Sequence, residues 1–504
     1  MKNLKRPSRL LIFVLATGLA VLNFNGFQAN RGLVKAASTY SCPSLSQPLL
    51  FRTDINKVKI DSEKLERTHR DLQQSLLQLR GVSNSSKGDL VIKAQGQAME
   101  RKAYLLEVMW GNPEAALASI LLDQQRTDLS SFSANCVETP VSIDGTLKII
   151  HIDFSDGGSE DRYSLITSRG EELQLHPARD LRQKIISGIK VRINGYRLDN
   201  EVLFDANEQA NGFTVLPAAG VSQIGAAGIP DAQGVQNTIV LLANFNNTPL
   251  PTLPKAQVDD MFFNQTNDYY VKTSYNRTNI TGNSFGWYTM PLGQTCNYSA
   301  ALSAAISAAD PSVNFASYGR LVMVFPFSNC GYAGLGTIGK MPVFTQDGTI
   351  NMSVAWIAAS VPNTGLYEHE FGHNLGVHHA SFLNCGSVTA AQTGCAINEY
   401  GDWYDVMGPI TYQGQMNAPH RDYLGWFGTS NIATITTDGT STIGALEILT
   451  SNLQALKIQR ATNDYLYIEY RQPIDTDQSF NQITGTNVFL GGLLHSLQFD
   501  YKPL

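Results

Sequence analysis

The spacing of apolar positions changes along the chain, and each change predicts a different kind of structure. Between residues 38 and 135, apolar residues recur at three- and four-residue intervals among charged ones, most clearly in residues 60–80. This spacing predicts amphipathic helices. From residue 137 to 215, short β-branched and apolar runs are separated by glycines, which predicts short strands joined by turns. We therefore expect a helical N-terminal region at 38–135 and a small β-barrel-like domain at 136–217.

The remaining half of the chain mixes the two patterns. Residues 218–234 are rich in glycine and alanine and predict a flexible linker, where a maturation cut is one hypothesis. Beyond it, apolar strand-like runs alternate with long helical ones, which predicts an α/β or α+β catalytic domain, a twisted sheet with a packed helix, at 235–430. Residues 431–504 return to strand-like runs and predict a β-rich C-terminal module.

The N-terminus predicts export. Four basic residues precede an apolar run at residues 10–22, which is too short to span a bilayer comfortably but suits a signal peptide at 1–37. We expect a secreted, extracellular protein with no stable membrane insertion after cleavage. The alternative is an uncleaved anchor, which would leave the protein periplasmic or at the cell surface.

Composition narrows the class of protein. With 43% hydrophobic and 16% charged residues the chain is typical of a globular protein. The formal net charge of −6 provides no basic surface for nucleic acid, so we expect no nucleic-acid partner.

Six cysteines, all beyond the predicted signal peptide, agree with export and favour disulfides, although six cysteines permit fifteen pairings. The last two are the nearest in sequence and are the first choice for a pair, and the first two are either paired or leave a free thiol. The expected pairs are Cys385–Cys395, Cys296–Cys330 and Cys42–Cys136.

Candidate chemistry is concentrated in residues 369–379, which read His-Glu-Phe-Gly-His-Asn-Leu-Gly-Val-His-His. On a helix expected at 367–375, His369 and His373 lie one turn apart on the same face. Two such imidazoles can bind one metal ion at about 2.0–2.1 Å. Glu370 follows the first histidine and is placed to activate a metal-bound water.

A third histidine extends this set. Gly376 can adopt a positive φ, so the helix can end there in a sharp turn that brings His379 back toward the metal. His378 is one position out of register and is interpreted as a bystander. The alternative is a helix whose histidines are solvated or satisfied in a core, but the glycine and third histidine at these offsets favour a metal site.

The full pattern, H-E-x-x-H-x-x-G-x-x-H, resembles that of the metzincin zinc peptidases, which also have a methionine-containing turn beneath the metal. Residues 404–409, Tyr-Asp-Val-Met-Gly-Pro, provide such a turn around Met407. Within the metzincins the chain is most similar to the gametolysin-type metallopeptidases, which are secreted. The resemblance covers residues 235–475 and is dense only at 367–427. Beyond the histidines it depends on Tyr400-Gly401-Asp402, Asn417-Ala418-Pro419, Leu424-Gly425-Trp426 and Tyr467-Ile468-Glu469-Tyr470-Arg471.

The resemblance implies a metzincin-like catalytic fold and a zinc endopeptidase that acts on protein or peptide substrates, some of them cell-wall glycoproteins. It implies that His369, His373 and His379 bind one catalytic zinc ion, that Glu370 is the catalytic residue, and that Met407 forms the turn beneath them. A calcium requirement is left open.

The sequence departs from the pattern of many metzincins in two respects. There is no clear cysteine-switch sequence, although Cys42 or Cys136 could bind zinc if it were not in the disulfide that we favour. Tyr412 lies five residues after Met407, whereas some metzincins place a tyrosine two residues after that methionine. Tyr412 and His420 are therefore secondary candidates for the site.

Two other functions are compatible with the motif. A non-catalytic extracellular binding or adhesion protein could use a metzincin scaffold. An intact glutamate and three histidines argue against such a loss of catalytic residues. A zinc amidase acting on cell-wall material would use the same ligands and would differ only in its substrate.

Overall fold

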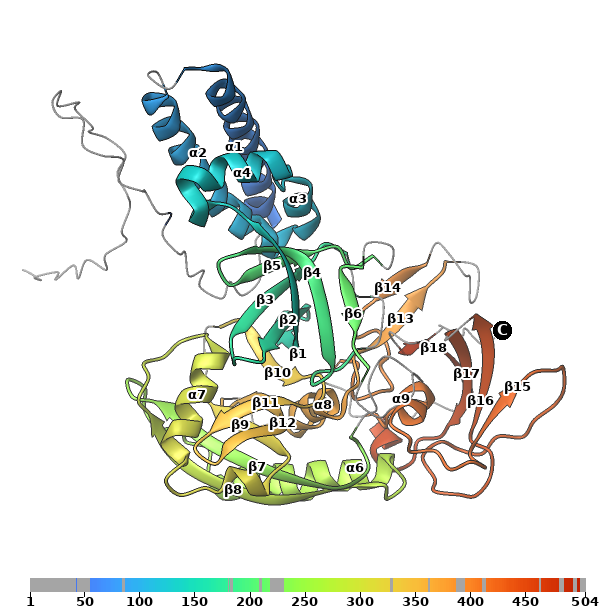
Figure 1. Ribbon diagram of the computed structural model, residues 1–504. Helices are drawn as coiled ribbons and strands as arrows, with labels where there is room; N and C mark the ends of the chain where they lie inside the picture. The colour runs from blue at the N-terminus through green and yellow to red at the C-terminus, as the bar shows by residue number, and fades with distance from the viewer. Residues whose placement is uncertain are drawn as a thin grey trace, which may run out of the picture. The chain divides into compact units, whose positions relative to one another are not determined.

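Two sheets and a set of helices make up the part of the chain that the computed structural model describes (Figure 1). All of this part belongs to one compact unit, Ser41–Leu504. The predicted signal peptide, most of the predicted linker and Tyr412 lie outside the described residues. The structure describes residues 42, 55–83, 87–179, 181, 185–207, 211–217, 231–326, 330–360, 363–386, 395–409, 414–461, 464–479, 485–492 and 496–498.

The N-terminal region is helical, as its apolar spacing predicts. Its helices are α1 (Ile55–Gly81), α2 (Gly88–Gly111), α3 (Pro113–Ala118) and α4 (Asp123–Ser133). Leu72 and Leu76 of α1 pack with Ala94 and Ala98 of α2 and Leu129 of α4 in one apolar cluster. None of the helices in the described ranges is both long enough and apolar enough to cross a membrane.

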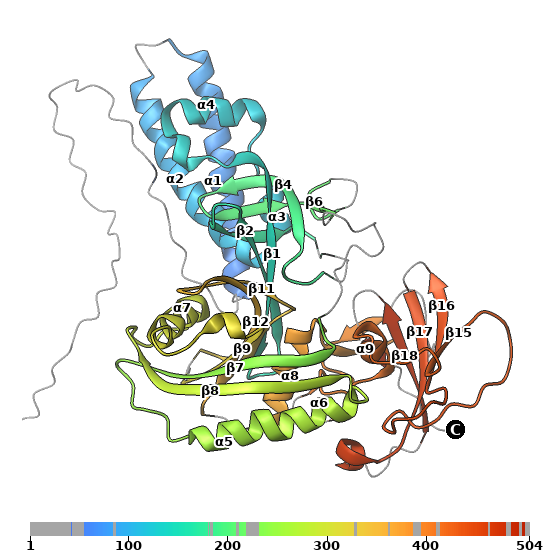
Figure 2. The same cartoon turned by 60° about the horizontal axis from the view of Figure 1, so that its bottom comes forward.

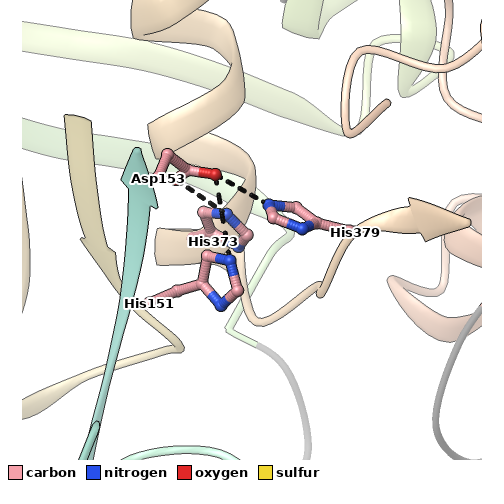
Figure 3. A group of neighbouring side chains, drawn as sticks. All are labelled: His151, Asp153, His373 and His379. Carbon is pink, nitrogen blue, oxygen red and sulfur yellow. Dashed lines mark hydrogen bonds and ion pairs between the residues drawn. The ribbon is translucent and has the colours of Figure 1, made fainter. Parts of the chain in front are cut away.

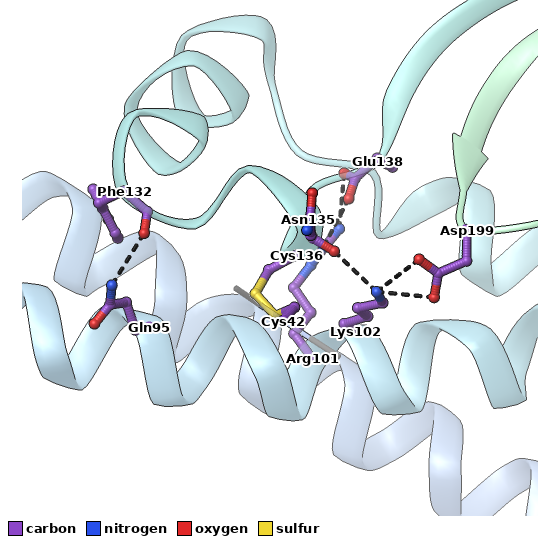
Figure 4. The surroundings of a disulfide bond; sticks show 9 residues. All are labelled: Cys42, Gln95, Arg101, Lys102, Phe132, Asn135, Cys136, Glu138 and Asp199. Carbon is purple, nitrogen blue, oxygen red and sulfur yellow. Dashed lines mark hydrogen bonds and ion pairs between the residues drawn. A yellow bond between two sulfur atoms is a disulfide. The ribbon is translucent and has the colours of Figure 1, made fainter. Parts of the chain in front are cut away.

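Polar contacts join these helices to the strands that follow (Figure 4). Arg101 of α2 forms a fully buried ion pair with Glu138, with Nη1–Oε2 and Nη2–Oε1 distances of 2.8 and 2.9 Å. Lys102 donates to the backbone oxygen of Asn135 and to Asp199, both at 2.9 Å. The Cys42–Cys136 disulfide lies in the same region. The helical region is therefore fastened to the start of the first strand.

Residues 139–215 form a closed ring of strands with an apolar interior. The strands are β1 (Thr139–Phe154), β2 (Ser159–Thr167), β3 (Glu172–Pro177), β4 (Lys190–Leu198), β5 (Glu201–Phe204) and β6 (Phe213–Val215). The pairing order is β1–β2–β3–β5–β4, and β4 returns to pair with the first half of β1. Leu147, Ile149, Leu165 and Val191 fill the interior. This is the barrel-like arrangement expected for the region.

The second half of β1 stays paired with β2 on one side and pairs antiparallel with β10 on the other. Through that pair the barrel is continuous with a mixed sheet of order β10–β12–β9–β7–β8, and twelve strands share the resulting sheet. Strands β12, β9, β7 and β8 are parallel, and β10 is antiparallel to β12. Their bounds are β7 (Gly234–Phe245), β8 (Thr278–Met290), β9 (Arg320–Phe325), β10 (Tyr332–Thr337), β11 (Met341–Thr345) and β12 (Gly348–Ala358).

Helices cover both faces of this sheet (Figures 1 and 2). Leu241 and Trp356 face the cluster that includes α7, whereas their neighbours Leu242 and Ile357 face the cluster that includes α8. Strands covered on both faces are apolar at consecutive positions. The helices that cover it are α5 (Lys255–Asp259), its continuation η4 (Asp260–Thr266), α6 (Asn267–Thr273), α7 (Tyr298–Ala309) and α8 (Thr364–Leu375), whereas α9 (Ala418–Tyr423) contacts strands of the C-terminal sheet. The fold is thus mixed α/β with a large mixed sheet, within the class expected.

A seven-stranded sheet contains the C-terminal residues. Its order is β14–β13–β19–β18–β17–β16–β15. The strands are β13 (Ala380–Asn384), β14 (Ala396–Asn398), β15 (Ile432–Ile435), β16 (Ala455–Ala461), β17 (Asp464–Arg471), β18 (Gly485–Gly492) and β19 (Ser496–Gln498). Strands β13 and β14 come from before residue 431, so this sheet crosses the expected boundary of the C-terminal module. The larger sheet likewise contains strands from both sides of the expected linker at 218–234. The expected domain boundaries stay predictions.

The three expected disulfides are confirmed. The Cys42–Cys136, Cys296–Cys330 and Cys385–Cys395 pairs form, and no cysteine is free. A free cysteine that could bind the metal is therefore ruled out by the structure. Such disulfides are typical of proteins that leave the reducing cytosol.

Candidate metal centre

Helix α8 holds the first part of the histidine motif and packs on β10 and β12. It begins at Thr364, three residues earlier than predicted, because the Asn363 side chain accepts a 3.0 Å hydrogen bond from the Gly365 amide and caps the first turn. It ends at Leu375 and is followed by Gly376, the C-cap residue, which adopts a φ of 109°. The left-handed residue is the expected sharp turn.

The turn after α8 is held by the methionine-containing loop. The amide of Ala380 donates to the backbone oxygen of Met407 at 2.9 Å. This bond anchors the residue next to His379, so the third histidine returns to the side of α8 on which the first two lie. The His369–His373, His369–His379 and His373–His379 ring centroids are 5.0, 5.1 and 5.1 Å apart. The sequence motif therefore becomes a nearly equilateral triangle of imidazoles.

Each of these rings is oriented by a hydrogen bond at Nδ1. The acceptors are the backbone oxygens of Val406 for His369 (2.8 Å) and Val377 for His373 (2.9 Å). The Nδ1 of His379 lies 2.9 Å from Oε1 of Glu399. An Nδ1–H that is donated in this way leaves the lone pair on Nε2, which is the atom that binds a metal.

The three imidazoles lie in a buried environment. All three histidines are buried, with at most 1% of their surface exposed. Burial, with a further contribution from neighbouring His151, lowers the pKa of His373 well below its usual value. The Nε2 atoms of His369 and His373 have no hydrogen-bond partner within the described ranges. Buried nitrogens of this kind fit a zinc ion, which binds neutral imidazole at about 2.0–2.1 Å.

An aspartate from outside the motif, Asp153, faces His373 and His379 (Figure 3). Oδ1 of Asp153, near the end of β1, is 2.9 Å from Nε2 of His379 and 3.5 Å from Nε2 of His369. Its Oδ2 is 3.7 Å from Nε2 of His373. The hydroxyl of Tyr400 donates to Oδ1 at 2.5 Å. Asp153 was not predicted from the sequence, where it is one of several polar residues in a strand-like segment and follows His151 by two positions.

His151 lies two residues earlier on the same strand and also faces this centre. One ligand atom from each of His151, Asp153, His373 and His379 lies within 4.8 Å of the others, so these four could hold a metal ion. His373 and His379 belong both to this group and to the sequence motif. The group adds His151 as a further histidine, whereas the motif adds His369. Nδ1 of His151 is 2.5 Å from Oδ1 of Asp161. Although burial opposes it, the Asp161 and Asp153 carboxylates raise the pKa of His151 to about 9. We therefore favour His369, since a protonated imidazole has no lone pair for a metal.

Glu370 is fully buried on the side of α8 that faces β10. A Cβ on Gly334 would collide with Oε1 of its carboxylate, and a Cβ on Gly336 would lie 3.1 Å from Oε2. Two glycines in β10 thus make room for this side chain. Burial, with a smaller contribution from the charge of Asp153, raises the pKa of Glu370 well above its usual value. Such a group can hold a proton near neutral pH.

Met407 lies beneath α8 and is fully buried. A Cβ on Gly372, inside the histidine motif, would collide with its sulfur. Oδ1 of Asp405 accepts the Met407 amide at 2.8 Å, and Oδ2 lies 2.8 Å from Nδ1 of His420. His420 therefore orients the turn and does not lie among the metal-facing histidines. His378 is likewise outside the four-residue group.

No protein-family model matches the chain, and a search of curated proteins finds no match. Support for a metal site therefore comes from the arrangement of the side chains in this structure. The resemblance to gametolysin-type peptidases depends on the motif residues alone.

Proposed function

We propose that this protein is a secreted zinc endopeptidase of the metzincin type, which hydrolyses peptide bonds in extracellular or cell-wall proteins. The observation that supports it most directly is the convergence of three buried Nε2 atoms beside a buried glutamate. Parallel strands β12, β9 and β7, an antiparallel strand β10 beside β12 and the packed helix α8 agree with a metzincin-like catalytic domain. The basic and apolar N-terminus and three disulfides support secretion.

Each side chain has a defined part in this reaction. His369, His373 and His379 would hold one zinc ion, which supplies Lewis-acid chemistry to a water molecule and to the scissile carbonyl. The Glu370 carboxylate takes a proton from the attacking water and passes it to the leaving amide nitrogen. A C–O bond forms and the C–N bond breaks, so one water is consumed and one carboxylic acid and one amine are released. Met407 packs under the ligands and takes no part in proton transfer.

The raised pKa of Glu370 suits this exchange. A carboxylate of ordinary pKa is a weak base and takes a proton from water poorly at neutral pH. Because burial disfavours the charged form, the glutamate binds the proton more tightly and can return it in the second half of the reaction.

Four full-length proteins test the proposal: the wild type, Asp153→Ala, and Glu370→Gln in each background. The Asp153→Ala chain is included because a carboxylate in the site can suppress turnover. Zinc is measured by atomic absorption, and cleavage is measured on labelled casein, with and without 1,10-phenanthroline. We expect one zinc per chain in all four, and chelator-sensitive cleavage only where Glu370 is present.

Three results would overturn the proposal. A chain without bound zinc excludes the metal site. Zinc-loaded chains that cleave peptidoglycan fragments and leave casein intact identify an amidase instead. Zinc without cleavage of either material in the Asp153→Ala chain identifies a binding protein.

A further inference from the structure

Strand β1 covers the edge of the sheet next to the metal centre. β10 pairs on one side with β12 and on the other with β1, with Ile152 opposite Leu335 and Asp153 opposite Gly334. Gly334 is the residue that makes room for Glu370. An extended peptide commonly binds by adding a strand to an exposed sheet edge. β1 therefore lies where an extended substrate would meet both the sheet and the catalytic glutamate.

The distances around Asp153 are those of a metal ligand. Two atoms bound to one tetrahedral zinc ion at about 2.0–2.2 Å lie about 3.3–3.6 Å apart. The Asp153 oxygens lie 2.9, 3.5 and 3.7 Å from the Nε2 atoms of His379, His369 and His373. These values lie on both sides of the tetrahedral spacing, so one ion can bind all four residues after small shifts.

The buried carboxyl groups at this site also favour a bound cation. Asp153 and Glu370 are both buried carboxyl groups at this site, and Oδ2 of Asp153 has no hydrogen-bond partner in the described part of the chain. An unpaired buried carboxylate oxygen is costly unless a cation or donor satisfies it. The hydroxyl of Tyr400 satisfies only Oδ1. A metal ion bound by the three histidines would satisfy Oδ2.

We propose that Asp153 is a fourth ligand of the catalytic metal, and that β1 thereby holds the full-length chain in a latent state. The latency rests on the proposed peptidase function, whereas the ligation by Asp153 does not. The carboxylate takes the coordination position that the reacting water needs, and the strand takes the edge that the substrate needs. All six cysteines are in disulfides, so no thiolate can do the same.

The ligation is tested with cobalt(II), which replaces zinc and has visible absorption that reports its coordination. Co²⁺-loaded full-length chains are titrated with acetohydroxamate, a small chelating anion. The variants are Asp153→Ala and Asp153→Asn, since one of them could misfold, and near-ultraviolet circular dichroism checks their packing. Asp144→Ala is the matched control, because Asp144 lies in the first half of β1 in an exposed ion pair with Arg192.

We expect both Asp153 variants to change the cobalt spectrum and to bind acetohydroxamate at least about tenfold more tightly than the wild type. The Asp144→Ala chain should match the wild type. If the wild type and a folded Asp153 variant give the same spectrum and the same affinity, Asp153 is not a ligand. A wild-type chain that binds no Co²⁺ overturns this inference and the proposed function together.

Casein cleavage separates the two proposals. The Asp153→Ala chain should cleave casein at least about tenfold faster than the wild type. Tighter acetohydroxamate binding without any cleavage keeps Asp153 as a ligand and rejects the peptidase. Equal cleavage by the two chains, with a changed cobalt spectrum, rejects the latency.

Discussion

The Nδ1 atoms of the three motif histidines bond to oxygen atoms from three different segments of the chain. Those acceptors are the backbone oxygen of Val406 in the methionine-containing turn, the backbone oxygen of Val377 just beyond α8, and the side chain of Glu399. A ring that is held at Nδ1 can rotate little, so its Nε2 points in a fixed direction. At the scale of single residues, the site therefore consists of three imidazoles whose Nε2 atoms are held in fixed directions.

Substitution of His369 and His151 tells which of them binds the metal. We expect His369→Ala to weaken zinc binding at least about 100-fold, because it removes a ligand, and His151→Ala to weaken it less than about tenfold. Zinc affinity is measured by competition with a chromophoric chelator. The reverse order would assign the site to the group of His151, Asp153, His373 and His379.

Gly334 should be essential for turnover but not for zinc binding. A methyl group on Gly334→Ala would collide with the Glu370 carboxylate and displace it, and a displacement of about 1 Å can cost about 100-fold in rate. We expect that loss in casein cleavage, measured in the Asp153→Ala background, with one zinc per chain retained. Gly88→Ala is the control, since a Cβ there meets no atom within 4 Å. An unchanged rate in Gly334→Ala would show that Glu370 has room to move.

At the scale of single elements, α8 is a short helix with mostly buried residues. Its position depends on its two ends and on two close contacts, one with β10 and one with the methionine-containing turn. Because glycines lie at those contacts, backbone approaches side chain more closely than any other residue would permit. The helix is therefore held by packing on both sides, and its first turn depends on a capping side chain.

The cap on α8 should contribute measurably to stability. Asn363→Ala removes the side-chain acceptor of the Gly365 amide and should lower the free energy of unfolding by about 1 kcal/mol. Asn363→Ser retains a capping oxygen and should lower it by much less. Urea unfolding followed by circular dichroism measures both. Equal losses in the two variants would mean that the asparagine acts through another contact.

At the scale of the molecule, β1 links three parts of the chain. Its first half closes the barrel, its second half pairs with β10, and the residue before it, Glu138, is buried against Arg101 of α2. The amide of Leu121 also donates to Glu138 at 2.7 Å. The N-terminal region is therefore not a loosely attached segment but shares hydrogen bonds and buried charge with the barrel.

This buried pair should make stability depend on pH in the acid range. Burial would raise the pKa of Glu138, but the charge of Arg101 outweighs burial and lowers this pKa below its ordinary value of 4.5. A lowered pKa in the folded state adds stability above pH 4.5, and this is lost as the pH falls toward the folded-state pKa. Glu138→Gln should cost about 3–5 kcal/mol near neutral pH, because it leaves Arg101 buried and unpaired.

The melting temperature between pH 7 and pH 3 measures this effect. Glu138→Gln should have a lower melting temperature at pH 7, and the difference from the wild type should shrink below pH 4.5. Asp144→Asn, which removes an exposed ion pair on the same strand, should change the melting temperature little. A gap between Glu138→Gln and the wild type that is constant over this range would argue against a lowered pKa.

The sequence by itself determined the local features of this protein. Helices follow the spacing of apolar residues in the N-terminal region, and strands follow the β-branched runs from residue 139 onward. The offsets between His369, His373, Gly376 and His379 were sufficient to predict three histidines around one point. These features depend on residues close in sequence, so periodicity and spacing report them. The three disulfide pairs were also predicted correctly.

Only the tertiary structure brought Asp153 and His151 to the metal centre. More than 200 residues separate Asp153 from His369, and no local pattern reports a contact over that distance. The contact arises because β1 is long enough to close the barrel and still pair with β10. Such pairing depends on which strand edges are free once the sheets have formed. The pairing of β1 with β10 is therefore a property of the assembled sheets. It determines which residues surround the candidate metal centre and which strand covers it.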